Sequence, residues 1–98
     1  MSLRDLILSL ISEVPEADNR MGISATIYLL RDAYMHGRAT EDDLRDALRD
    51  VVDAVISMTE PLLEPEEKKK KVEKWVNQLL GAIKMETVRT RTLRRVRF

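Results

Sequence analysis

The fold of this chain is decided by residues 40–58, TEDDLRDALRDVVDAVISM. Thr40 stands three residues before Asp43, a capping-box spacing that predicts a helix beginning at Thr40, and acidic residues in its first turn suit the positive end of the helix dipole. Apolar residues then recur at spacings of 4, 3, 4 and 3, at Leu44, Leu48, Val51, Val55 and Met58, with Val52 and Ile56 in a second stripe. This pattern requires at least one long helical neighbour.

Two further helices are expected before this segment. Ser2 and Asp5 form a cap signal for a first helix over Leu3–Val14, which Pro15 ends. A second helix is expected over Arg20–His36, with Asn19 as its cap and Gly37 after its end. Its apolar residues extend most of the way around the helix, so it should be covered on several sides: Met21, Ile23, Ile27, Tyr28, Leu29, Leu30, Tyr34 and Met35.

A fourth helix is expected over Pro65–Met85, because proline is favoured at a first helical position. Its buried residues are expected to be Val72, Trp75, Val76, Leu79, Leu80 and Ile83. The chain is therefore predicted to be all-α, a compact bundle of about four helices over residues 1–86 followed by an arm at 87–98. The alternative is a smaller core completed by the second or third helix pairing across a dimer axis.

The arm from Thr87 to Phe98 differs from the rest of the chain. It has no acid, glycine or proline, and it carries five arginines: Arg89, Arg91, Arg94, Arg95 and Arg97. All of them except Arg94 fall on one side at a spacing of two, which predicts an extended, strand-like segment that needs a partner strand from elsewhere. The alternative is a frayed basic end that adds solubility.

The net charge of zero hides a strong polarity along the chain. Residues 1–67 carry 6 basic and 15 acidic side chains, whereas residues 68–98 carry 11 basic and 2 acidic ones. The acidic charge includes a stripe on one face of the third helix, formed by Asp43, Asp46, Asp50 and Asp53. This acidic face is either a solvated surface, with Arg45 and Arg49 pairing locally, or a docking face for the basic arm of the same or another copy.

The lysine run Lys68, Lys69, Lys70 and Lys71 opens the fourth helix, where positive charge opposes the helix dipole. Acidic residues just upstream, including Glu66 and Glu67, offset part of that cost. The run is either a self-compensated solvated turn or a contact for phosphate groups.

Composition excludes most catalytic chemistry. The chain has no cysteine and one histidine, His36, and its three glycines are too dispersed for a phosphate-binding loop. No enzyme activity, cofactor, metal site or small-molecule substrate is expected. No stretch is apolar enough for a signal peptide or a membrane span, so a cytoplasmic location is expected. Few amides and many charged residues are typical of a thermophile.

These features favour a small, non-enzymatic assembly or accessory subunit. It is expected to self-associate, most simply as a dimer, or to bind a protein partner through apolar helix faces and the arginine-rich arm. The alternative is a nucleic-acid-associated protein. In that case phosphate contacts come from Lys68, Lys69, Lys70, Lys71, Arg89, Arg91, Arg94, Arg95 and Arg97.

Overall fold

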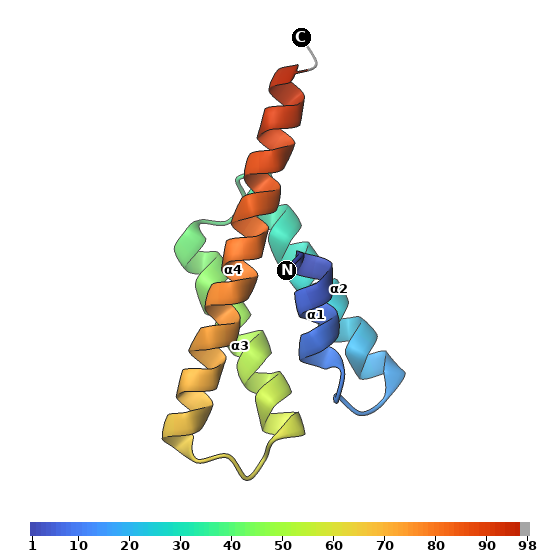
Figure 1. The fold of residues 1–98 in the computed structure, drawn as a ribbon, viewed down its shortest axis with the longest axis vertical. Helices are drawn as coiled ribbons and strands as arrows, with labels where there is room; N and C mark the ends of the chain where they lie inside the picture. The colour runs from blue at the N-terminus through green and yellow to red at the C-terminus, as the bar shows by residue number, and fades with distance from the viewer. Residues whose placement is uncertain (97–98) are drawn as a thin grey trace.

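Four helices that alternate in direction form the protein (Figure 1). The computed structural model describes the backbone of residues 1–96 and the side chains of residues 1–90. The helices are α1 (Leu3–Ile11), α2 (Ala17–Met35), α3 (Glu41–Thr59) and α4 (Pro65–Val96). Over residues 1–96 the chain contains no strand. The predicted all-α bundle of four helices is confirmed.

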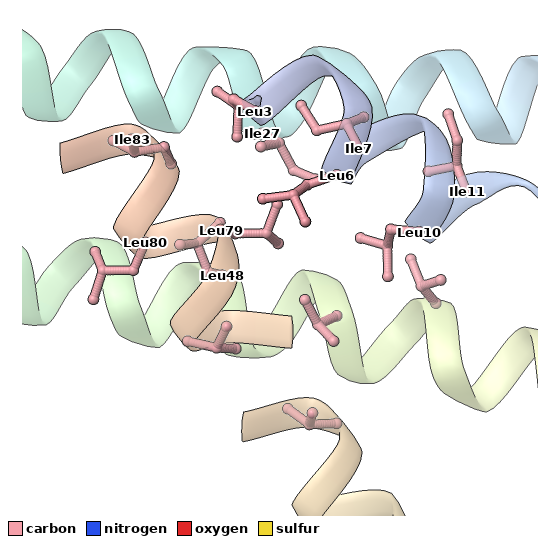
Figure 2. Close-up of a cluster of buried hydrophobic side chains, with 14 of the residues drawn as sticks. Leu3, Leu6, Ile7, Leu10, Ile11, Ile27, Leu48, Leu79, Leu80 and Ile83 are labelled. Carbon is pink, nitrogen blue, oxygen red and sulfur yellow. The ribbon is translucent and has the colours of Figure 1, made fainter. Parts of the chain in front are cut away.

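The core is a single cluster to which every helix contributes. α3 packs on α2 and α4, and α1 packs on both α2 and α4. Leu6 of α1 and Leu79 of α4 meet at the centre, close to Leu48 of α3 (Figure 2). Fully burying one aliphatic side chain stabilises a fold by about 1.5–3 kcal/mol, so this cluster is the main favourable contribution to folding.

Capping at α1 and α3 follows the sequence prediction. The Ser2 hydroxyl accepts from the Asp5 backbone N–H at 3.1 Å. At α3 the capping box is complete: Thr40 Oγ1 accepts from the Asp43 N–H at 3.1 Å, and the Asp43 carboxylate accepts from the Thr40 N–H at 3.1 Å. Gly37, with φ of 74°, occupies the left-handed region after the end of α2.

The predicted start of α2 is wrong. The helix begins at Ala17, three residues before the expected Arg20, and its N-cap is Glu16, which has φ of 67° and no side-chain cap bond. Asn19 lies inside the first turn, where its amide donates to the Pro15 carbonyl at 3.3 Å. The Arg20 guanidinium donates to the Val14 carbonyl at 2.8 Å. These two side chains satisfy loop carbonyls, and neither caps the helix.

The buried side of α3 also departs from the expected stripe. Leu44, Leu48 and Val55 are buried as predicted, together with Val52 and Ile56. Val51 is only half-buried and Met58 is exposed. The reason is that a straight α-helix has 3.6 residues per turn, so its core face drifts away from a strict 3.5-residue repeat. In α4, Trp75 is half-buried against the core rather than buried within it.

The end of α4 is the largest difference from the sequence prediction. The expected end near Met85 is wrong, because the helix continues to Val96 and projects beyond the other three helices (Figure 1). Residues 87–96, the part of the predicted arm whose backbone the structure describes, continue this helix. Thr87 is 6% exposed, and its hydroxyl donates to the Ile83 carbonyl at 3.0 Å.

A simple physical reason accounts for this continuation. Each residue added to an existing helix gains a backbone hydrogen bond, whereas a β-branched residue costs only about 0.7 kcal/mol or less. The arm has no glycine or proline to end the helix. The side chains of Arg91, Arg94 and Arg95, and the whole of Arg97, lie outside the described residues.

We expect Thr40→Ala to lower the free energy of unfolding by about 1 kcal/mol, because the substitution removes the acceptor for the Asp43 N–H. Thr40→Ser keeps that acceptor and should change stability by only a few tenths of a kcal/mol. Urea unfolding followed by circular dichroism measures both variants. Equal stability of the alanine and serine variants would contradict the capping role.

Candidate protein-interaction surfaces

The outward side of α2 is an uncharged surface. The exposed residues between Arg20 and Arg31, which we call the α2 outer face, are Met21, Gly22, Ala25, Thr26 and Leu29. Met21 is 69% exposed and Leu29 is 68% exposed. Of the apolar residues expected to cover this helix on several sides, only Ile27 is fully buried. The α2 outer face is thus an apolar surface that the rest of the chain leaves uncovered.

Two apolar grooves lie on either side of this face. The groove between α1 and α2 has a volume of about 610 Å³, and its walls include Leu8, Met21 and Tyr28. The groove between α2 and α3 has a volume of about 310 Å³, and its walls include Ala54 and Met58. The outward side of α2 is therefore a ridge between two apolar grooves.

A larger groove lies on the other side of α1, between α1, α2 and α4. We call it the α1–α4 groove; its volume is about 1000 Å³. Trp75, the only tryptophan, lies half-buried on its wall. Apolar and charged side chains both line it, among them Leu3, Tyr28, Ala82 and Met85, and Arg4, Arg31, Glu86 and Arg89. Arg89 places the upper end of this groove at the base of the arm.

Ion pairs join α3 to α4 along the length of α3. The Glu41 carboxylate lies 2.8 Å from Lys84 Nζ at one end, and Asp53 lies 2.7 Å from Lys68 Nζ toward the other. Between them, Arg49 Nε donates to Glu73 at 2.7 Å. These side chains are mostly a third or more exposed, so solvent screens each pair and each adds little to stability. Their combined effect is to fix the register of the two antiparallel helices.

The acidic face of α3 is largely occupied by contacts within the chain. Asp43 belongs to the capping box, and Asp53 pairs with Lys68. Asp46 pairs with Arg49 at 3.1 Å, as the sequence spacing predicted. Arg45 instead reaches across to α4 and donates to Asn77 at 2.9 Å. All four aspartates nevertheless remain exposed to solvent.

The two predicted basic contact regions are not brought together. Lys68 and Lys71 bind Asp53 and Glu60 of the α3 side, whereas Lys69 and Lys70 are exposed. The lysine run opens α4, and Arg89, Arg91, Arg94 and Arg95 lie toward its opposite end. At 1.5 Å per residue, roughly 30 Å separates the two regions. They do not form one phosphate-binding patch.

The α3–α4 contacts also lower several carboxyl pKa values. The hydrogen bond from Arg49 holds the pKa of Glu73 below its ordinary value of 4.5. Lys84 lowers the pKa of Glu41 in the same way, and Lys68 lowers the pKa of Asp53. The folded state therefore binds these protons less tightly than the unfolded state, and acid should destabilise the α3–α4 pair.

Sequence patterns missed both the α2 outer face and the α1–α4 groove. The signal for the first was available: no charge occurs from Met21 to Leu30, in a chain whose residues are 35% charged. The groove had no comparable signal, because its existence depends on how far α1 reaches between α2 and α4.

No family model, curated protein or solved structure matches this chain. Within residues 1–96, none of the helices combines the length and apolarity needed to cross a membrane. In that same part of the chain, no group of three or more histidine or carboxylate side chains is placed to hold a metal ion. The surfaces described above are therefore interpreted from their own chemistry.

We expect Glu73→Gln to lower the free energy of unfolding at pH 7 by roughly 0.2–1 kcal/mol. The stabilisation from Glu73 is present above the ordinary glutamate pKa and is lost as the pH falls through its lowered folded-state value. The variant and the parent should thus converge as the pH falls below the lowered folded-state pKa of Glu73, where the carboxyl is protonated in both states. Thermal unfolding across this pH range measures the effect.

Glu13→Gln is the control, because Glu13 is exposed and forms no ion pair with the described residues. It should leave the stability at pH 7 unchanged. A Glu73→Gln deficit that persists at low pH would contradict the assigned ion pair.

Proposed function

We propose that this protein is a small, non-enzymatic assembly subunit that pairs with a second copy through the α2 outer face. The supporting observation is the lack of any exposed charge between Arg20 and Arg31 on a helix whose neighbours α3 and α4 are strongly charged outside. Large apolar patches on a soluble chain mark surfaces that are covered by another molecule. Leu8 of α1, 53% exposed, extends the patch beside α2.

The shape of the α2 outer face suits a two-fold interface. Such an interface requires a surface that is complementary to itself. A ridge beside a groove meets this requirement, since the α2 ridge of one copy can lie in the α1–α2 groove of the other. Gly22 and Ala25 on the ridge have small side chains or none, which permits close approach of two helices. The arm would then contact exposed carboxylates such as Asp46 and Asp50 of the second copy.

We expect Leu29→Lys to shift the protein toward the monomer and to weaken self-association at least about tenfold, because the lysine charge would be buried in an apolar interface. Leu62→Lys is the matched control. Leu62 is 94% exposed in the turn between α3 and α4, far along the chain from α2. Size-exclusion chromatography with light scattering measures the mass. A parent protein that is monomeric at tens of micromolar would contradict the proposal.

Contact with nucleic acid is the second candidate function. It is favoured by one observation: α4 carries its basic end clear of the acidic bundle (Figure 1). Arg89 and the four arginines that follow it in the sequence would supply the phosphate contacts. The lysine run would add little, because two of its members already pair with carboxylates.

If this candidate function is correct, a labelled DNA duplex should bind with an affinity that falls steeply with salt. Five phosphate contacts give a slope of log K against log salt concentration of about −4.5. Replacing all five arginines with alanine should abolish the binding, as measured by fluorescence anisotropy. No binding of the parent at about 50 mM salt would reject this function.

A further inference from the structure

α1 is much shorter than the two helices beside it, so it fills only part of its place in the four-helix bundle. α1 has 9 residues, which makes it about 13.5 Å long, whereas α2 has 19 residues and α4 has 32. On this side of the molecule α1 is the helix that packs on both α2 and α4. The N-terminal end of α1 lies level with the middle of α4 (Figure 1). The α1–α4 groove follows α1 from Ser9 to Leu3 and continues past its start to Met1, with α2 and α4 as its other walls.

The groove is long enough for a helix. Its α4 wall extends from Trp75 to Arg89, which corresponds to about 21 Å at 1.5 Å per residue. Its α2 wall includes Tyr28 and Arg31. A helix of about four turns, lying beside α1, would match this length.

The lining of the groove specifies an amphipathic occupant. Trp75, Ala82 and Met85 provide an apolar floor on α4, and Met85 is largely exposed. Three arginines surround this apolar floor, and each comes from a different helix: Arg4 from α1, Arg31 from α2 and Arg89 from α4. Glu86 is the one acidic residue of the lining, so the groove carries a positive balance.

Glu86 indicates that the groove is incomplete. Its Oε2 atom is buried and has no hydrogen-bond partner among the described residues. Its Oε1 atom lies 3.8 Å from Arg31 Nη1, too far for a hydrogen bond. The Arg31 guanidinium instead lies 2.9 Å from Asp32 and 4.9 Å from the centroid of the Tyr28 ring. A ligand that offers a donor group here would satisfy the Glu86 carboxylate.

We propose that the α1–α4 groove binds an amphipathic helix of a different protein, with an apolar face against Trp75 and Met85 and carboxylate side chains along its edges. The charge of the groove selects acidic edges, because the occupant's carboxylates would face Arg4 and Arg89, which are both exposed. Beside Glu86 the occupant would offer a donor side chain, since Arg31 already pairs with Asp32. A second copy does not supply such a helix from the described residues, since α3, the acidic helix, buries its apolar face in its own core.

This site and the surface assigned to self-association share Tyr28 but lie on opposite sides of α1. Arg4 and Ser9 line the α1–α4 groove, whereas Leu8 and Ser12 line the groove on the α2 side of α1. The inference therefore does not depend on the proposed dimer. It adds a partner helix to a subunit that pairs with itself elsewhere.

The test uses Trp75 as the reporter, because it is the only tryptophan and lies in the groove. The probes are two synthetic helical peptides of about 14 residues without tryptophan. They share leucines at helical spacing, and one has glutamate at the edge positions where the other has lysine. The glutamate-edged peptide should change the Trp75 fluorescence saturably, and the lysine-edged peptide should bind at least about tenfold more weakly.

Arg89→Glu should weaken binding of the glutamate-edged peptide at least about tenfold. Arg38→Glu is the matched control: it makes the same charge change at an exposed loop residue outside the groove lining, and should leave the affinity unchanged. Circular dichroism confirms that both variants are folded. Leu29→Lys should also leave peptide binding intact, which separates this test from the test of the dimer.

Three results would overturn the proposal. The first is the absence of any binding by the glutamate-edged peptide, and the second is equal affinity for the lysine-edged peptide. The third is displacement of the bound peptide by a DNA duplex, which would show that the arginines around the groove bind phosphates instead.

Discussion

The antiparallel packing of α3 on α4 is the constraint on which the rest of the structure depends. Leu44, Leu48 and Val52 of α3 are fully buried, as are Val76 and Leu79 of α4, so the two helices share one continuous apolar seam. Ion pairs on its flanks fix how far one helix is displaced along the other. Because α4 is 13 residues longer than α3, this register determines how much of α4 extends past the bundle.

The short α1 accounts for the α1–α4 groove. It inserts Leu6, Ile7 and Leu10 into the core, which is enough to close the bundle around Ile27 and Leu79. It is too short, however, to cover the upper part of α4, so the groove stays open there. The α2 outer face has a separate origin, because it is the ridge between the α1–α2 groove and the α2–α3 groove.

The sequence predicted local structure well where a single helix determines the outcome. The Thr40 capping box and the core positions Val76, Leu79 and Ile83 are as expected, because they depend on caps and on helical spacing. The helical continuation into residues 87–96 was not predicted, because alternation at a spacing of two favours an extended segment. The opposing signal was the absence of a glycine or proline that would end the helix. The α1–α4 groove was also missed, because it arises from differences in length between helices that are distant in the sequence.

The continuity of α4 has a mechanical consequence. Ile83 is anchored in the core, and the same helix reaches Val96 without interruption, about 20 Å further along its axis. A helix of this kind acts as a lever, so a tilt of roughly 10° at the bundle would move its far end by about 3–4 Å. The wall of the α1–α4 groove is part of that lever. A helix bound in the groove, as proposed above, would therefore contact the same element that carries the basic end.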